Sequence, residues 1–524
     1  MSKEIFTNAK IYVDRNHFEE AMCVEDGIIK EVGRTEDLLS RAGSGCHVTD
    51  CEGRTIVPGM NDSHLHLMQY GETLNQACIE GARSINELID ICRKFIKEHP
   101  DKAARGVHSI GWNQDSFEDS SRLPGKEDLD RISRDVPVVL ERVCGHIASV
   151  NSRALEAMGI DSAGHDGIMR GDMVVTAKET VPDFTMAEKR SIMIETMKKA
   201  ASMGVTSVQS NDIGADFDDD SEAFAMIGDI YDKDEAVIRY HYQMCFATPE
   251  KFEEFLTQGE YLNPRYREEG SMLTLGPLKL FKDGSLGART AYMMDSYADD
   301  PGNIGLPWLS CEDMDRYCSI AARYGIQVVT HAIGNRAISE TLDSYEKIMP
   351  KGSNPLRHGV VHCQITDRSL TDRIKRDDVL IMAQPVFIDY DMHIVEKLCG
   401  SSLASTSYAF GSMLRDGVHL SYGTDCPVES CNPFENIYAA VTRKDKQGLP
   451  EEGFYPAEGV DVETAIDAYT AESAYAQFME TKKGRLKPGY YADFLILDRD
   501  IFTADPSEIK DIHPITTIVK GRRV

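Results

Sequence analysis

The sequence predicts an α/β fold: a (β/α)₈ TIM barrel with a small composite β-sandwich domain formed by both termini and a long insertion after barrel strand 1. Eight apolar, strand-like runs alternate with helical stretches along the middle of the chain. Short strand-like segments occupy both ends of the chain. The gap between the first and second runs is longer than a single helix requires, which predicts the insertion.

Eight runs equal the number of strands that a (β/α)₈ barrel needs, and active sites of such barrels form where the strands end. The runs are Thr55–Val57 leading to His64, Gly204–Ser210, Arg239–Phe246, Pro277–Asp283, Ile326–His331, Gly359–Gln364, Val379–Val386 and Val418–Asp425. We therefore expect the barrel domain to span residues 58–485.

The two ends of the chain are expected to meet in one sandwich, made of residues 1–57 and 486–524. The turn signal Asp26-Gly27 separates two N-terminal strand-like segments, and the C-terminal segments have the same short, alternating character. The insertion is expected at roughly residues 75–190, over the barrel mouth. Its Trp112 lies in a polar and aromatic stretch, so we expect this residue to contact a ligand.

Composition excludes several classes of function. With 524 residues, 42% hydrophobic and 27% charged, the chain resembles an ordinary globular protein. The net charge of −29 argues against nucleic acid as a partner. No run is long and apolar enough to span a membrane. The 13 cysteines contain no Cys-x-x-Cys pair and no signal peptide is evident, so we expect a cytoplasmic protein.

The first candidate metal ligands are His64 and His66, at the end of the first run. Because side chains two residues apart point to the same side of an extended chain, both imidazoles should face one metal ion. His331, His362 and Asp425 follow the fifth, sixth and eighth runs, so they should converge on the same barrel mouth. Neutral imidazoles and a carboxylate suit zinc or a similar divalent ion.

The fourth run contains two lysines, Lys279 and Lys282, whose odd separation sends them to opposite faces of a strand. We expect Lys279 in the barrel lumen, because this choice lets Leu278 and Leu280 pack outward. Burial and nearby metal ions would lower the pKa of its amine. The free amine could then capture carbon dioxide and form a carbamate that bridges two metal ions; the alternative is a buried lysine paired with Asp283.

These residues, in this order, resemble the amidohydrolase superfamily, and in particular its amidohydrolase-3 branch, the YtcJ-like proteins that include N-substituted formamide deformylases. The segments that carry the resemblance are Val57–His66, Lys279–Ala291, Gly423–Glu429 and Gly484–Phe494. The resemblance covers nearly the whole chain.

The resemblance implies two divalent ions per chain, of which Zn²⁺ is the expected one. His64, His66 and Asp425 would bind one ion, His331 and His362 the other, and carboxylated Lys279 would bridge them. It also implies that His146 and Asn151 face the substrate, and we expect His146 to stabilise an oxyanion during catalysis.

The function expected from these parts is hydrolysis of non-peptide C–N bonds, in an amide, N-acyl or N-formyl compound, through a metal-activated hydroxide. Asp425 would carry a proton from water to the leaving nitrogen. Two alternatives remain: a deaminase on the same barrel, which would manage with one metal and without the bridging lysine, or a regulatory or binding barrel without catalysis. The expected partner is a small-molecule amide, and homo-oligomerisation stays open.

Overall fold

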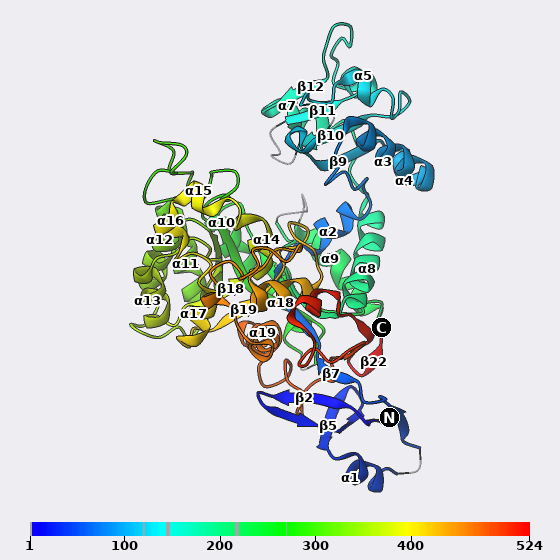
Figure 1. The fold of residues 1–524 in the computed structure, drawn as a ribbon, viewed down its shortest axis with the longest axis vertical. Coiled ribbons are helices and arrows are strands. Elements are labelled where there is room, and N and C mark those ends of the chain that lie inside the picture. The colour runs from blue at the N-terminus through cyan, green and yellow to red at the C-terminus, as the bar shows by residue number, and fades with distance from the viewer. Residues whose placement is uncertain (1–2, 44, 119–120, 143–146, 215–219, 269) are drawn as a thin grey trace. The chain divides into compact units, whose positions relative to one another are not determined.

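The computed structural model describes residues 3–43, 45–118, 121–142, 147–214, 220–268 and 270–524. By contacts between residues, the chain divides into two units. One unit combines Met1–Leu67 with Ile194–Val524, and the other is Met68–Met193. The first unit contains the barrel and the strands of both termini (Figure 1).

The barrel is an eight-stranded sheet in which every neighbouring pair is parallel. Along the sheet the strands follow chain order, as a TIM barrel requires. They are β8 (Met60–Leu65), β13 (Val205–Ser210), β14 (Arg239–Met244), β15 (Leu273–Phe281), β16 (Val328–Ala332), β17 (Gly359–His362), β18 (Leu380–Ala383) and β19 (Leu420–Tyr422). The predicted fold class is therefore confirmed.

The seam between the first and last strands is closed at the ends of β8 and β19. The backbone N–H of Asp425 donates to the carbonyl of His64, with 2.8 Å between nitrogen and oxygen. The buried Asp62 carboxylate accepts hydrogen bonds from the Thr424 backbone and from its hydroxyl. Two candidate ligands, His64 and Asp425, therefore close the barrel themselves, together with residues next to them in sequence.

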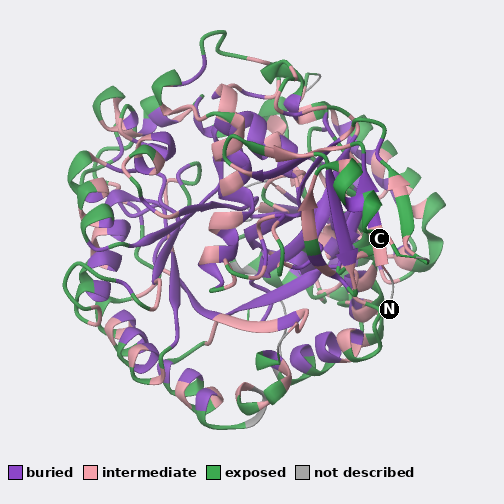
Figure 2. Ribbon diagram, turned by 90° about the horizontal axis from the view of Figure 1, so that it is seen from below, coloured by how far each residue is buried: buried purple, intermediate pink, exposed green. Residues whose placement is uncertain are grey.

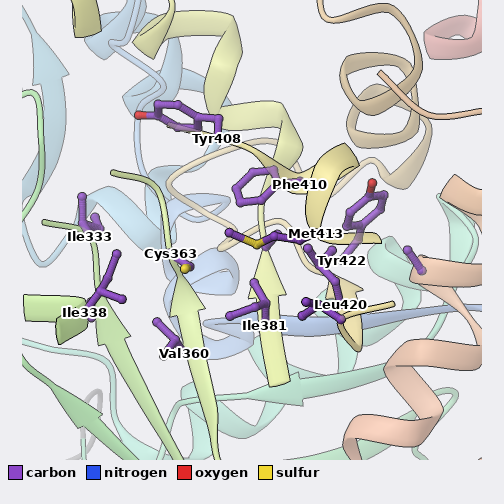
Figure 3. Packing of buried hydrophobic residues seen from close by; sticks show 14 of the residues in the cluster. Ile333, Ile338, Val360, Cys363, Ile381, Tyr408, Phe410, Met413, Leu420 and Tyr422 are labelled. Carbon is purple, nitrogen blue, oxygen red and sulfur yellow. The ribbon is translucent and has the colours of Figure 1, made fainter. Parts of the chain in front are cut away.

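Helices surround the barrel and bury their apolar faces against its strands. Figure 2 shows the buried strands inside a ring of helices whose outer faces are exposed. Close to β17, β18 and β19, Val360, Ile381 and Leu420 pack with Phe410 and Met413 of α17 (Phe410–Arg415) (Figure 3). Helices on the outer layer include α10 (Pro249–Thr257), α11 (Cys311–Tyr324), α12 (Asn335–Glu346), α13 (Arg368–Arg376), α18 (Pro433–Thr442) and α19 (Val462–Tyr469).

Strands from both termini form two further sheets. One contains β5 (Ile28–Gly33), β4 (Ala21–Glu25), β1 (Lys3–Thr7) and β6 (His47–Asp50), in that order. The other contains β22 (Arg522–Arg523), β21 (Pro514–Val519), β20 (Phe494–Leu497), β7 (Thr55–Pro58), β2 (Lys10–Asp14) and β3 (His17–Glu19). Phe6 and Phe494 meet edge to face in the core between them, with 5.0 Å between ring centroids. This is the composite sandwich that the sequence predicts.

One strand assignment from the sequence is wrong. The first barrel run was counted from Thr55, although the sandwich was also expected to reach residue 57; Thr55–Val57 belongs to β7 of the six-stranded sheet, and the barrel strand is β8. Gly59 separates the two strands at a close approach, where a Cβ atom would lie 2.2 Å from the Thr206 hydroxyl oxygen. Apolar composition continues through this glycine, so composition alone could not locate the break.

The second unit, Met68–Met193, interrupts the chain between β8 and β13. Its sheet has the order β12 (Ile168–Arg170), β11 (Ile147–Val150), β10 (Val138–Arg142) and β9 (Val107–Trp112). Two apolar clusters form its core, and α3 (Ile85–Glu98) contributes to the larger one. Across both units, none of the described helices combines the length and the hydrophobicity that crossing a membrane requires.

Candidate metal centre

His64, His66 and Asp425 form a group of potential metal ligands at the barrel seam. One oxygen of the Asp425 carboxylate, Oδ1, lies 3.3 Å from Nε2 of His64 and 3.4 Å from Nε2 of His66. His64 is at the end of β8, and Asp425 follows β19. The seam hydrogen bonds therefore fix the distance between the two elements that carry these side chains.

His331 of β16 and His362 of β17 lie on the neighbouring side of the same mouth. Their ring centroids are 4.4 Å apart, and the ring of His362 is 5.8 Å from that of His64. All four histidines expected from the sequence, together with Asp425, are therefore brought together.

Lys279 and Lys282 of β15 have opposite environments, as the odd spacing predicts. The Lys279 amine is fully buried and lies 3.3 Å from Nε2 of His64. The Lys282 amine lies 2.8 Å from a carboxylate oxygen of Glu340 in the helical layer. Asp283 does not pair with Lys279; its carboxylate accepts backbone N–H groups of three residues instead.

Hydrogen bonds to the far ring nitrogens orient the imidazoles. Nδ1 of His64 faces the side-chain oxygen of Gln243 at 2.6 Å, and Nδ1 of His362 faces that of Gln384 at 2.8 Å. Nδ1 of His66 lies 2.9 Å from the carbonyl of Asn211. Each Nδ1 therefore carries the proton, which leaves the lone pair on Nε2.

His331 uses the opposite arrangement. Its Nε2 lies 3.1 Å from the carbonyl oxygen of Gly284, so Nε2 carries the proton and Nδ1 keeps the lone pair. In all four rings, one nitrogen is held by a hydrogen-bond acceptor and the other is left as a potential metal ligand.

Burial keeps these bases neutral. It lowers the pKa of His64 to about 4 and that of His331 to about 3, with the charge of Lys279 adding to both shifts. Burial also lowers the pKa of the Lys279 amine to about 8. For Asp425 burial acts in the opposite direction, yet the close contacts with His64 and His66 hold the pKa of its carboxyl well below the ordinary value. The cluster thus offers neutral nitrogens and one carboxylate.

The backbone is unusual at two of these residues. His362 has φ of 75° and Asp425 has φ of 57°, in the left-handed region that side chains with a Cβ rarely adopt. Non-glycine residues held in this region concentrate at functional sites. At His362 this conformation ends the in-and-out alternation of β17, so the direction of its side chain does not follow from strand periodicity.

Comparison with known proteins identifies the family. A model of the amidohydrolase family matches residues 47–524. The chain belongs to the amidohydrolase family. The YtcJ protein of Bacillus subtilis (strain 168) is 30% identical over 527 residues, which cover 96% of each protein. An N-substituted formamide deformylase of Arthrobacter pascens is 23% identical, with 99% of this chain and 97% of that protein covered.

A solved structure of similar sequence supports the same assignment. An uncharacterised metal-dependent hydrolase of Pyrococcus furiosus is 26% identical, with a TM-score of 0.78 over 96% of this chain and all of that one. As a member of this family, the chain is a metal-dependent hydrolase.

The donor atoms of this amidohydrolase fit a divalent metal. The mouth presents imidazole nitrogens with free lone pairs, one carboxylate and a buried amine, which is a ligand set suited to zinc-type ions. Hydrogen bonds to the opposite ring nitrogens are typical of histidines that bind metal.

Two of the three residues expected at the substrate are described, and both belong to the second unit. Trp112 is fully buried in the core of the second unit, where its indole N–H donates to the Leu140 carbonyl. Asn151 is also fully buried; it caps α6 (Ser152–Ala157) and donates to the carbonyls of Ser133 and Val136. The polar side-chain atoms of Trp112 and Asn151 are thus engaged inside the second unit, and a contact of either residue with substrate stays a prediction. His146 lies outside the described residues.

Sequence analysis missed the residues that orient the ligands. Gln243, Gln384 and Asp62 are buried polar side chains next to candidate ligands. Gln243 could have been found, since it lies near the end of the third predicted run and its polar side chain needs a partner when buried. Gln384 follows β18, where no periodic signal predicts its direction.

Proposed function

We propose that this amidohydrolase hydrolyses non-peptide C–N bonds of small amides, including N-acyl and N-formyl compounds. The observation that carries the proposal is the arrangement around Nε2 of His64, which lies 3.3 Å from the Asp425 carboxylate and 3.3 Å from the Lys279 amine. Similarity to the formamide deformylase favours an amide over other substrates. The expected cation is Zn²⁺, with two ions per chain.

His64, His66 and Asp425 would hold one ion, and His331 with His362 the other. Lys279 would join the two after its amine adds to carbon dioxide, which forms an N–C bond and releases one proton. The resulting carbamate has two oxygens available for bridging. When bound, the metal supplies a Lewis acid for the substrate carbonyl and lowers the pKa of water toward neutrality.

Asp425 would move the proton of the reaction. Its Oδ1 takes a proton as water attacks the carbonyl carbon, and it returns this proton to the nitrogen as the C–N bond breaks. The nitrogen must be protonated because an amide anion is a very poor leaving group. The products are a carboxylic acid and an amine.

Two measurements test the proposal together. The first is amine release from a panel of N-formyl and N-acyl amines by zinc-supplemented protein, with Asp425→Asn as control; release by the wild type alone supports it. The second is metal content: two zinc ions per chain are expected, whereas a single ion with ammonia release from an amino-heterocycle would instead indicate a deaminase. No amine release from any N-formyl or N-acyl amine by the metal-bound protein would overturn the proposal.

We also propose a cytoplasmic location. The described cysteines are all free thiols, which suits a reducing compartment. Fractionation of the native host is the direct measurement, and recovery of the protein outside the cytoplasm would contradict it.

A further inference from the structure

Three aromatic rings lie against the two histidines of β16 and β17. Phe281 is 5.7 Å from His331 between ring centroids, and Phe387 is 5.8 Å from His362 with the planes 19° apart. Trp308 lies almost parallel to His331, at 9° and 6.2 Å. We name Phe281, Trp308 and Phe387 the aromatic wall.

The backbone of Trp308 is held in place, and its side chain is exposed. Its backbone N–H donates to the carbonyl of Lys282, just beyond the end of β15, at 2.8 Å. The residue is nevertheless 60% exposed, and the nearby Leu306 is exposed to a similar extent, 58%. Among the described residues, no ring other than His331 contacts the indole. A large apolar face that is mostly exposed therefore lies beside the metal centre, against His331.

The Asp425 carboxylate lies on the side of His64 and His66. His64 and His66 are contacted by the Gln243 side chain, the Asn211 carbonyl and the Asp425 carboxylate. A substrate carbonyl at the centre would therefore have a polar side toward Asp425 and an apolar side toward the aromatic wall.

The two sides can be matched to the two halves of an amide. Asp425 must reach the leaving nitrogen to protonate it, so the amine half points toward His64 and His66. The acyl half then extends over His331 and His362, toward the aromatic wall. An aryl ring one or two bonds from the carbonyl carbon would lie where it can stack on the indole.

We propose that the substrate is an amide with an aromatic or similarly bulky apolar acyl group, and that Trp308 binds this group by stacking. The proposal rests on the proposed amide hydrolysis and specifies its substrate class. Water adds to the carbonyl carbon, the C–N bond breaks, and an aryl-bearing carboxylic acid and an amine leave. The water proton passes through Asp425 to the nitrogen.

Binding can be tested without turnover, because the chain has two tryptophans and Trp112 is buried in the second unit. Zinc-loaded protein is titrated with phenylacetate, acetate and benzylamine while tryptophan emission is recorded. Phenylacetate should give a saturable blue shift or quenching that is absent with acetate and absent from Trp308→Phe. A saturable change with benzylamine alone, or no change with any compound, would overturn the proposal.

Turnover then tests specificity. The substrates are N-phenylacetyl methylamine, N-acetyl methylamine and N-formyl benzylamine. Trp308→Ala should lower kcat/KM about tenfold or more for the phenylacetyl amide and leave the acetyl amide within about twofold. Trp308→Phe should retain most of the preference, and Leu306→Ala, equally exposed but without a ring contact to His331, should leave all three rates unchanged.

The outcomes separate the two proposals. A saturable change of Trp308 emission with phenylacetate, without cleavage of any amide, would contradict amide hydrolysis and leave the aromatic acyl site standing. Cleavage of all three amides at rates that Trp308→Ala does not alter would support amide hydrolysis and overturn the aromatic acyl site. Preference for the formyl benzylamine, lost in Trp308→Ala, would place the aromatic half on the amine side and overturn the assignment.

Discussion

The barrel buries one lysine near its mouth and another near its base. Comparing the surroundings of the two amines shows which features go with the candidate metal centre and which go with burial alone. Lys279, near the end of β15, lies beside His64. Lys483 donates to the hydroxyl of Ser207 in β13, close to the ion pair of Arg239 with Asp493. Both amines are buried and both have a lowered pKa, about 8 for Lys279 and about 7 for Lys483.

The difference lies in the partners. Around Lys279 several imidazoles and the Asp425 carboxylate converge, whereas Lys483 has a hydroxyl, the single imidazole of His241 and an arginine that is already paired with an aspartate. A shifted pKa alone therefore does not identify a catalytic centre; convergence of metal-binding donor atoms does.

The largest expected effect is at the mouth. Asp425→Asn should lower kcat by about 10²–10⁴-fold, because the amide cannot shuttle the proton. The seam hydrogen bond from the residue 425 backbone remains, so the thermal midpoint should stay close to that of the wild type. Steady-state rates and a melting curve check this, and an unchanged rate would remove Asp425 from the mechanism.

Substituting each lysine in turn is the sharpest test of the comparison. Lys279→Met should reduce bound zinc to one ion or none per chain, because the proposed bridge is lost. Lys483→Met should keep the full zinc content and activity. Elemental analysis of both purified variants measures this; equal metal loss in the two would abolish the distinction between mouth and base.

Two buried glutamines can be compared in the same way as the two lysines, with a smaller expected effect on zinc binding. Gln243→Leu removes the acceptor that orients His64 and should weaken zinc binding about 10–100-fold, measured by competition with a chelator. Gln327 is the matched control; it precedes β16, and its side chain donates to two backbone carbonyls. Gln327→Leu should leave zinc affinity unchanged.

The smallest effect is a pH dependence of stability at the base. Between pH 7 and about 10, folded Lys483 is neutral while the unfolded chain holds the proton, so unfolding takes up a proton. The free energy of unfolding therefore rises with pH in this window, by up to about 1.4 kcal/mol per unit. Urea titrations at pH 7, 8 and 9 should show a flatter slope for Lys483→Met.

The exposed Lys397→Met serves as the control for that experiment and should keep the wild-type slope. If Lys483→Met also keeps the wild-type slope, the buried amine is protonated in the folded protein throughout the range from pH 7 to pH 9.

Strand periodicity was enough to predict much of the barrel. Counting eight apolar runs gave the sheet, and the odd spacing of Lys279 and Lys282 predicted which one faces the mouth. Where the period of a strand ends, the sequence does not predict the direction of a side chain. Gly59 divides one apolar run into strands of two different sheets, and Trp308 lies in a loop after β15, where no period predicts its direction.

The second unit could not be interpreted in this way. Trp112 and Asn151 were assigned to a ligand from their chemistry, yet a large ring and an amide are equally useful inside a small core, as a filler and as a helix cap. Residue type without a position on a known element does not distinguish these roles.

The strand order also sets a sequence of events during synthesis. His64 and His66 leave the ribosome before the whole second unit, and β13, the partner of β8, follows it. Asp425 and the sandwich strands β20–β22 arrive near the end. β8, which carries His64, therefore stays unpaired until the second unit and β13 have been made. A chaperone that shields β8 during this time would raise the yield of active protein, and more so than for a barrel whose first two strands are not separated by an inserted unit.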